Sequence, residues 1–327
     1  MYIVFGETAE QFFEGALEEA LKTKISEELR GWSEGVRPKD ELQLPQYIVS
    51  GKYCDSARDV WWKYVRKASV KKTKPLLQGG LYHEILAEII PLSKQYIYNS
   101  GVNAGFDILT HLMESREATI EKIFENNRSD VMKLLRVSDI NEIKDNMRKM
   151  WNYQSVQIAA SVDMVLSKFM WIDADALVAK AIPISVEQKL DGSRIGLSRQ
   201  LSVDALKVPH TVIMDVKTGK PRKFHDLTVT GYAMAYESEF KVPVDIGCII
   251  YPQFLEKKSV PYIEKKFYIV TDELRKAFLE ERNRKASIIL EERDPGLASY
   301  CPESCGYFMN CHPTGKDERL KDQEPSL

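Results

Sequence analysis

The chain has 327 residues, of which 44% are apolar and 29% are charged, a composition that predicts a packed core in one large domain or two. The sequence has no run of about 18 apolar residues and no basic-then-apolar leader, so we expect no transmembrane helix, no signal peptide and a cytoplasmic location. The net charge of -2 neither supports nor excludes nucleic acid as a ligand, because a local basic surface can be hidden in such an average.

The first part of the chain predicts helices. Apolar residues at helical spacing indicate an amphipathic helix over residues 7–33, followed by a proline-containing loop over 35–50. The segment CDSARDVWWKYVRKA (54–68) then predicts a second helix.

A basic run with interleaved aromatic residues covers this second helix and the segment after it. Its members are Lys63, Arg66, Lys67, Lys71, Lys72 and Lys74, with Trp61, Trp62 and Tyr64 between or before them. Cations that follow a backbone and rings that stack on bases are typical of nucleic-acid binding. A solvated charged face, with the rings packed against the rest of the protein, explains the same pattern equally well.

Two adjacent glycines precede a predicted helix over 81–90, which places His83 in its first turn. A lone histidine at such a position serves packing or capping unless other residues require a ligand there. The pattern stays helical over 100–170, with breaks near residue 138 and after Met170.

After Pro183 the hydrophobic period changes to that of strands. The expected elements are a strand over 184–190, a turn at 191–193, a returning strand over 194–197, a short run 201–203 that ends at Asp204, a strand 212–214 that ends at Asp215, a helix over 225–240, strands over 244–252 and 265–270, and a helix from Thr271 to about Arg293. We therefore predict an α/β fold in which helices come first and a meander of short strands follows.

Three charged side chains near two strand ends are candidates for catalysis. Asp215 and Lys217 project from the same face of a strand, because side chains alternate along it. Asp204 joins them if its run pairs with that strand. Two carboxylates hold a hard cation such as Mg2+ or Mn2+, which lowers the pKa of a bound water and screens a phosphate, and a lysine stabilises the developing charge. Taken alone, an Asp-x-Lys sequence is most often an ordinary solvated ion pair.

Three of the five cysteines gather near the C-terminus, with the spacing Cys301-x3-Cys305-x5-Cys311. An odd number of cysteines in a cytoplasmic chain argues against a disulfide framework and favours a metal or an iron–sulfur cluster. The fourth ligand is either His312 or Cys54, and composition does not separate zinc from an iron–sulfur cluster. Unrelated free thiols are the alternative.

The order of these motifs resembles that of a known family. Cys54 is followed by Gly-x-x-His ending at His83, by Asp204, by Asp215 and Lys217, by a helix that carries Tyr232, and by the three clustered cysteines. This order is similar to that of RecB-like nucleases of the PD-(D/E)xK superfamily that carry a 4Fe–4S cluster. Among them it most resembles the CRISPR-associated exonucleases of spacer acquisition, in particular the archaeal variant of type I-A systems.

The resemblance implies a role for each matching position. His83, Asp204 and Asp215 would bind Mg2+ or Mn2+, and Lys217 would be the catalytic lysine beside the two aspartates. Tyr232 and Thr228 would contact DNA from the helix motif. Cys54, Cys301, Cys305 and Cys311 would hold the 4Fe–4S cluster.

Three positions depart from the family pattern. Thr228 stands where the helix motif has glutamine, which puts full activity in doubt. Asp215 stands where glutamate is usual, a change that the superfamily allows. Three residues rather than two separate Cys301 from Cys305.

The resemblance also implies an architecture and a function. We expect a mainly helical N-terminal region over 1–178, a RecB-like PD-(D/E)xK mixed-sheet core over 179–293, a cysteine-cluster segment over 294–313 and a flexible tail over 314–327. The expected function is metal-dependent exonucleolytic cleavage of single-stranded DNA ends, together with CRISPR integration proteins and with possible homo-oligomers. The alternative is a DNA-end-binding or scaffold subunit of the integration complex that does not cut.

Overall fold

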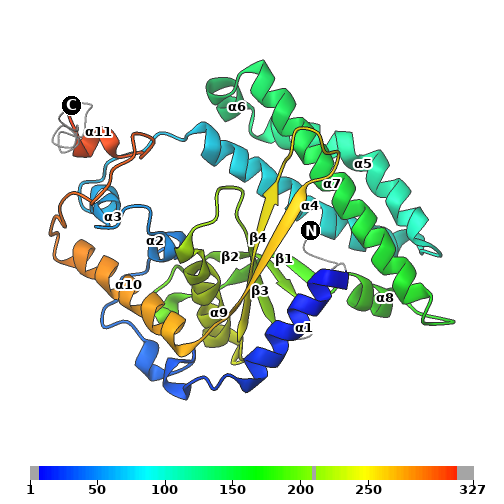
Figure 1. Ribbon diagram of the computed structural model, residues 1–327, viewed down its shortest axis with the longest axis horizontal. Coiled ribbons are helices and arrows are strands. Elements are labelled where there is room, and N and C mark those ends of the chain that lie inside the picture. The colour runs from blue at the N-terminus through cyan, green and yellow to red at the C-terminus, as the bar shows by residue number, and fades with distance from the viewer. Residues whose placement is uncertain (1–6, 208–210, 315–327) are drawn as a thin grey trace, which may run out of the picture.

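A mixed five-stranded sheet lies at the centre of the molecule (Figure 1), in a computed structural model that describes residues 7–207 and 211–314. The spatial order is β1-β2-β3-β4-β5, and all neighbours are antiparallel except β3 and β4. The strands are β1 (Ile184–Leu190), β2 (Leu201–Lys207), β3 (Val212–Val216), β4 (Ile246–Gln253) and β5 (Tyr262–Ile269). The predicted mixed α/β class and the meander of β1, β2 and β3 are confirmed.

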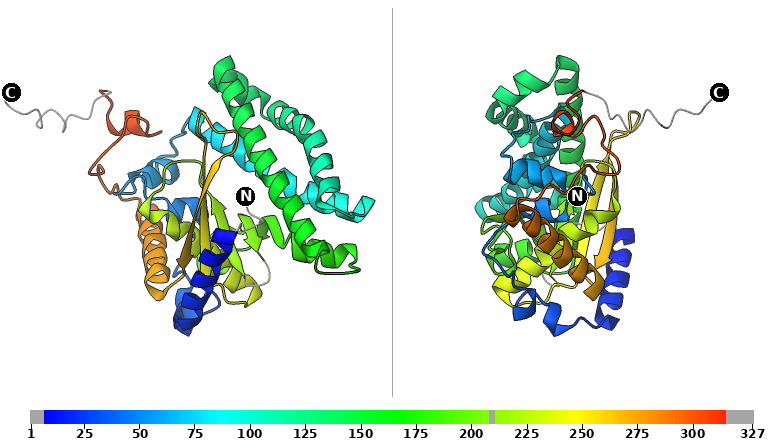
Figure 2. Two further views of the ribbon diagram at one scale, coloured as in Figure 1. Left: turned by 45° about the vertical axis from the view of Figure 1, so that its right-hand side comes forward. Right: turned by 90° about the vertical axis from the view of Figure 1, so that its left-hand side faces the viewer.

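Helices cover both faces of this sheet (Figure 2). On one face α1 (Glu7–Lys22) and α4 (Lys74–Ser100) contact the strands, and the same hydrophobic core continues outward into α5 (Gly105–Asn126), α6 (Arg128–Leu134), α7 (Val137–Leu166) and α8 (Ala174–Ala181). The other packs against α2 (Gln46–Ser50), α9 (Asp226–Phe240) and α10 (Asp272–Leu290). The boundary predicted at residue 178 falls inside α8, and the division into domains stays a prediction. The predicted tail lies, apart from Thr314, outside the described residues.

The N-terminal helix is shorter than predicted. It ends at Lys22, and residues 27–36 form two short 3-10 turns, η1 (Glu27–Leu29) and η2 (Glu34–Val36). Between these turns Gly31 lies close against α9, since a Cβ atom at Gly31 would stand 1.9 Å from the Met234 carbonyl oxygen. The predicted helix over 7–33 is therefore wrong beyond its first half.

The second predicted helix begins later than expected. Ala57 has a left-handed backbone, with φ of 58°, so α3 covers only Arg58–Tyr64 and Cys54 lies in the turn before it. The segment expected to be a loop over 35–50 contains the short helix α2. Helix α11 (Phe308–Cys311) lies close to α3, because the Trp62 indole nitrogen donates a hydrogen bond to Cys311 Sγ at 3.3 Å.

His83 lies well inside a helix rather than in its first turn. Helix α4 begins at Lys74, with Pro75 in the first turn where its missing N–H is not needed, and runs through both glycines. Gly79 is useful inside the helix because it allows close approach: a Cβ atom at this position would stand 3.2 Å from Thr218 Oγ1. The prediction that the His83 backbone lies at a helix start is wrong.

Two other boundaries differ from those that the pattern predicts. Residues 193–197 do not return as a strand; they hold the 3-10 turn η3 (Ser193–Ile195) and Gly196, whose φ is +74°. Helix α10 begins as predicted, with the Thr271 hydroxyl accepting from the Leu274 amide, but it ends at Leu290. The helical break near residue 138 falls just before Val137, where the Asp139 carboxylate accepts from the Arg136 amide.

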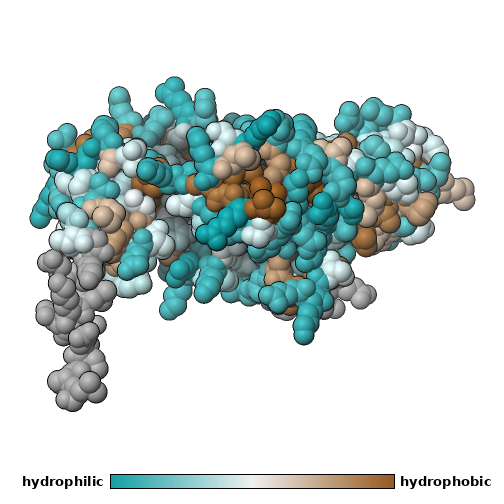
Figure 3. All heavy atoms as spheres, turned by 90° about the horizontal axis from the view of Figure 1, so that it is seen from above, coloured by the Kyte–Doolittle hydropathy of each residue, from teal (hydrophilic) through white to brown (hydrophobic). Residues whose placement is uncertain are grey.

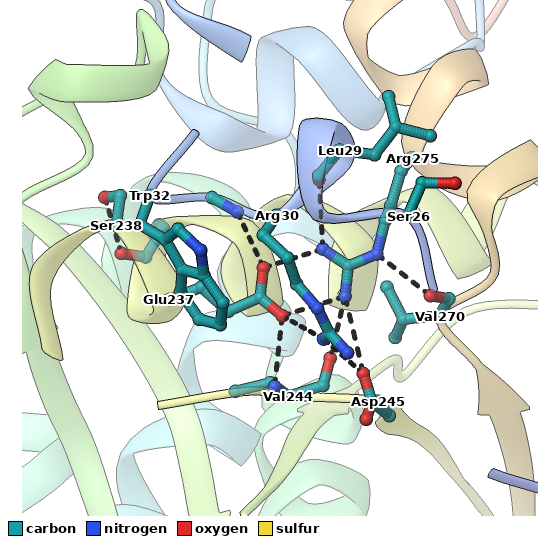
Figure 4. A network of polar contacts seen from close by, with 12 residues as sticks. Ser26, Leu29, Arg30, Trp32, Glu237, Ser238, Val244, Asp245, Val270 and Arg275 are labelled. Atoms are coloured by element: carbon teal, nitrogen blue, oxygen red, sulfur yellow. Dashed lines mark hydrogen bonds and ion pairs between the residues drawn. The ribbon is translucent and has the colours of Figure 1, made fainter. Parts of the chain in front are cut away.

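A buried ionic network joins the N-terminal segment to the sheet and to the helices α9 and α10 (Figure 4). Glu237 on α9 and Arg275 on α10 have fully buried side chains and form two hydrogen bonds, of 2.7 and 2.9 Å. Arg30 donates to Glu237 at 2.8 Å and also pairs with Asp245. The Gly31 amide donates to the same carboxylate at 2.7 Å. Every buried charge in this group thus has an opposite charge beside it.

The outer surface fits the composition. The face shown in Figure 3 is mostly hydrophilic, with apolar side chains gathered near its middle and towards one end. Among the described residues, none of the helices has the length and apolar character needed to span a membrane. Cys248 lies fully buried on β4, where burial raises the pKa of its thiol to about 12.

Candidate functional site

The sheet register brings the two candidate aspartates to the same place. Strands β2 and β3 pair antiparallel with Ala205 opposite Met214, so the next positions, Asp204 and Asp215, stand opposite each other. The strand pairing expected for the Asp204 run is present, but the run does not end at Asp204 as predicted, because β2 continues to Lys207. The parallel strand β4 supports the same end of β3, because the Lys217 amide donates to the Ile250 carbonyl at 2.9 Å.

Asp215 and Lys217 form a buried ion pair. Lys217 Nζ lies 2.9 Å from Asp215 Oδ2, and the aspartate is 4% exposed. Apart from this ion pair, Asp215 Oδ2 has no hydrogen-bond partner in the described part of the chain. Burial raises the pKa of Asp215 to about 6; the nearby Asp204 carboxylate adds to this rise, and the Lys217 ammonium opposes it. A buried carboxylate oxygen that accepts no hydrogen bond is available as a ligand for a cation.

Asp204 contacts both a histidine and the end of β3. Its Oδ2 lies 3.4 Å from His83 Nδ1 and accepts a hydrogen bond from the Val216 amide at 2.8 Å. Burial disfavours the Asp204 carboxylate, but His83 and the Val216 amide outweigh this and hold its pKa below the usual value. The same pairing raises the pKa of His83, although burial opposes it.

An irregularity in β2 aims the Asp204 side chain. Val203 and Leu206 pack in the same core cluster, so the two-residue alternation is broken between them. On β1 the opposite residue is Glu187, whose φ is +49°, and the ladder pairs neither Glu187 nor Asp204. Interruptions of this kind re-aim side chains next to active sites. They carry no signal in the hydrophobic pattern.

Helix α9 places Tyr232 near the two carboxylates, whereas it turns the Thr228 hydroxyl towards Ser50. Burial and the charges of Asp215 and Asp204 raise the pKa of Tyr232 far above its usual value, so its hydroxyl stays protonated near both carboxylates. Thr228 is 4% exposed, and its hydroxyl donates to Ser50 Oγ at 3.3 Å. Thr228 still lines the cavity that contains Lys217.

A histidine to which the sequence motifs assign no role lines this cavity as well. His225 is 2% exposed, its Nδ1 lies 2.9 Å from the Tyr251 hydroxyl, and its Nε2 lies 3.4 Å from the Tyr53 hydroxyl. Burial, with the charges of Lys217 and Arg222, lowers the pKa of His225 to about 4. His225 is therefore neutral at neutral pH.

The low pKa of His225 predicts a pH-dependent stability. An unfolded histidine has a pKa of about 6.5, so the unfolded chain binds more protons than the folded one between that pH and about 4. The His225 contribution to stability should therefore be lost as the pH falls through this window. In His225→Gln the melting temperature should fall less steeply from pH 7 to pH 4.5 than in the wild type. Parallel curves would assign the acid sensitivity to other groups.

Four of the cysteines line one small cavity. Cys54, Cys301, Cys305 and Cys311 all border it, whereas the His312 ring packs on Phe308 with centroids 4.8 Å apart. None of the five cysteines, all of which lie in the described residues, forms a disulfide. Of the two candidates for a fourth ligand, Cys54 is the one that shares the cavity with the other three.

Several hydrogen bonds hold the C-terminal segment against the turn that carries Cys54. Arg58 makes two hydrogen bonds with Asp294, of 2.8 and 2.6 Å. The Asp55 carboxylate accepts from the Ser299 amide at 3.0 Å, and Ser56 Oγ donates to the Gly296 carbonyl at 2.9 Å. These contacts explain how residues more than two hundred positions apart come together.

Neither the aspartate site nor the cysteine cavity has its side chains already arranged around an ion. Over residues 7–207 and 211–314, no cluster of three or more His, Cys, Asp or Glu side chains is found that could hold a metal as it stands. The donor types fit nonetheless: oxygen and imidazole donors suit Mg2+ or Mn2+, and four thiolates suit zinc or an iron–sulfur cluster.

The basic run is partly neutralised within the protein. Lys72 pairs with Asp130 at 2.9 Å, and Lys74 pairs with Asp139 at 2.7 Å. The indole nitrogens of Trp61 and Trp62 both donate hydrogen bonds inside the protein, which favours packing over base stacking for these rings.

Comparisons with known proteins give one consistent result. The family model described as CRISPR-associated exonuclease Csa1 matches residues 7–314. A protein of Saccharolobus solfataricus with that name is 32% identical over 295 residues, which cover 90% of this chain and 94% of the relative. A protein of the same name from Thermoproteus tenax is 28% identical over 291 residues, which cover 88% and 92%.

Proposed function

Because the chain belongs to the family of CRISPR-associated exonucleases named Csa1, as its motif order predicts, we propose that it is a metal-dependent exonuclease for single-stranded DNA ends. In this proposal it works in the cytoplasm and prepares DNA for spacer acquisition. The observation that carries the proposal is the meeting of His83, Asp204, Asp215 and Lys217 where the end of β3 lies beside the middle of β2.

The proposed core is of the PD-(D/E)xK type. Its support is the position of Asp215 and Lys217 at the end of a central strand, with Asp204 delivered by the neighbouring antiparallel strand. His83, Asp204 and Asp215 would hold Mg2+ or Mn2+, which supplies a water of lowered pKa and screens the phosphate.

The protein side chains have separate tasks in this proposal. Lys217 keeps its proton, because pairing with Asp215 raises its pKa despite burial, so it is a donor that stabilises charge on the scissile phosphate. The Asp204 carboxylate is held in place by the Val216 amide and by His83, and it orients the His83 imidazole in return. Tyr232, held neutral beside the carboxylates, is a hydrogen-bond donor for the DNA backbone.

We also propose that Cys54, Cys301, Cys305 and Cys311 hold a 4Fe–4S cluster with a structural role. The cavity that the four share supports this assignment. The cluster would join the turn before α3 to the C-terminal segment and so close a very long loop, which constrains the unfolded chain.

The cluster proposal predicts a difference between cysteines. Anaerobically purified wild type should be brown and contain iron and sulfide, and Cys54→Ser and Cys305→Ser should each lose the visible absorbance. Cys248→Ala is the matched control, because Cys248 is buried in the sheet away from the cavity, and it should keep the colour. A colourless wild type that contains zinc would overturn the iron–sulfur assignment.

A second function is favoured by Thr228. Its hydroxyl is buried against Ser50, where the family pattern has a glutamine amide, so one contact to DNA is absent from this helix. The protein would then hold DNA ends for CRISPR integration proteins, alone or as a homo-oligomer, without cutting. Binding of a labelled oligonucleotide without cleavage in Mg2+ or Mn2+ would favour this function over the nuclease.

A further inference from the structure

An exposed tyrosine stands where the two candidate centres adjoin. Tyr53 directly precedes Cys54, and 67% of its surface is exposed. It lines the cavity of the four cysteines and also the adjoining cavity that contains Lys217. Tyr53 has no part in the proposed metal site, in the cluster or in the contacts of α9 with DNA.

The Tyr53 ring is held in place although it is exposed. Its edge packs against the Phe224 ring, with centroids 5.0 Å apart and planes at 84°. Its hydroxyl makes a long contact of 3.4 Å with His225 Nε2, and His225 Nδ1 lies 2.9 Å from the Tyr251 hydroxyl. Tyr251 is buried on β4, next to the Ile250 carbonyl that binds the Lys217 amide. A fixed ring loses little entropy when a ligand stacks on it.

Cations and further rings surround Tyr53. A third cavity, which also contains Tyr53, is lined by the rings of Phe224, Tyr300 and Tyr307 and by two cations, Arg222 and Lys52, of which Lys52 pairs with Glu281 at 2.9 Å. The exposed loop after Lys217 carries Lys220, Arg222 and Lys223, and none of these three forms an ion pair within the described part of the chain. Aromatic faces beside unpaired cations are the pattern that binds single-stranded nucleic acid, because rings stack on bases and cations follow the phosphates.

We infer that Tyr53 is a stacking platform for a base of the single strand whose backbone reaches Lys217, and that His225 is the residue that positions this platform. This inference rests on the proposed DNA-binding function. It goes beyond that function because it assigns a base-binding position between the metal centre and the cysteine segment. An exposed aromatic ring at the rim of a cysteine cavity can also shield that cavity from solvent. The experiment must therefore detect a contact between Tyr53 and a DNA base.

The first test measures binding without cleavage. Fluorescence anisotropy with a labelled single-stranded oligonucleotide in EDTA should show about tenfold weaker binding for Tyr53→Ala, since removing a stacking ring costs about that much. Tyr53→Phe keeps the ring and should weaken binding by about threefold at most. The matched control is Tyr98→Ala, a half-exposed tyrosine on α4 that lines none of these three cavities.

The second test asks whether the lost contact is to a base. Abasic sites are placed along the oligonucleotide, one position at a time. At one position the abasic site should weaken wild-type binding by about tenfold and leave Tyr53→Ala binding unchanged, because both changes remove the same contact. Equal losses in both proteins at every position, or wild-type affinity in Tyr53→Ala, would overturn the inference.

The positioning role of His225 has its own readout. His225→Phe keeps an aromatic ring but removes the contact to the Tyr53 hydroxyl, so it should weaken binding as much as Tyr53→Phe does. The double variant should bind no more weakly than either single variant, and additive losses would remove His225 from the account. If the wild type binds DNA but never cuts it, the nuclease proposal is overturned, but the stacking role of Tyr53 is not. A wild type that binds no single strand would overturn the platform.

Discussion

Replacing Lys217 by alanine should slow DNA cleavage by about a hundred- to a thousandfold, because it removes a preorganised donor from a buried site. Lys217 is held 2.9 Å from Asp215, and pairing with that carboxylate raises its pKa, so it stays charged where the phosphate would lie. Cleavage rates would be measured in Mn2+ with labelled single-stranded DNA under single-turnover conditions. Binding in EDTA should change much less, since the rest of the site remains.

Lys220→Ala is the matched control for Lys217→Ala. Lys220 lies three positions on in the same loop and is exposed, with no ion partner in the described residues. Its removal should change affinity and salt dependence but leave the rate at saturating DNA near that of the wild type. Similar rates in wild type and Lys217→Ala, or an equal loss in both variants, would exclude Lys217 as the catalytic lysine.

Replacing Glu237 by glutamine should cost about 3–5 kcal/mol of folding free energy, the largest stability effect expected here. The change removes the negative charge between the buried Arg275 and Arg30 guanidinium groups, and it replaces one of the two accepting oxygens by an amide nitrogen that can only donate. The N-terminal segment, α9, β4 and α10 all lose a shared anchor (Figure 4). Urea-induced unfolding, followed by circular dichroism, should show a lower midpoint with an unchanged slope.

Glu117→Gln makes the same chemical change on the surface. The Glu117 side chain is 48% exposed and pairs with Arg116 and Arg148, and exposed pairs of this kind contribute less than about 1 kcal/mol. Equal midpoints for Glu237→Gln and Glu117→Gln would show that the buried network does not hold the N-terminal segment in place.

The strand pairing that brings the candidate aspartates together could be predicted from the sequence, because it follows from the strand period. Asp215 and Lys217 follow a buried apolar run, and the pairing expected for the Asp204 run is present. The predicted position of His83 was wrong because a helix can run through two glycines when tertiary packing favours it. The shared cavity of Cys54 with the three late cysteines rests on contacts between residues 55–58 and 294–299, which no local pattern contains.

Other features have almost no sequence signal. The two 3-10 turns after α1 lie on either side of Gly31, which packs closely on α9, and α3 begins late because the backbone of Ala57 is left-handed. Tyr53 and His225 belong to no motif, and only the fold brings their side chains beside Lys217. Residue type and adjacency to Cys54 were the only available hints for Tyr53.

The most direct test of the nuclease proposal is a time course of end-labelled single-stranded DNA with the wild type and Asp215→Asn, in Mn2+, Mg2+ or EDTA. We expect progressive shortening of the DNA in Mn2+ or Mg2+ and none in EDTA. We expect none with Asp215→Asn either, because its side chain keeps its shape but loses the charge that a cation needs. Intact DNA in every lane, from wild type that retains its cluster and binds the oligonucleotide, would contradict the nuclease and favour the subunit that holds DNA ends without cutting.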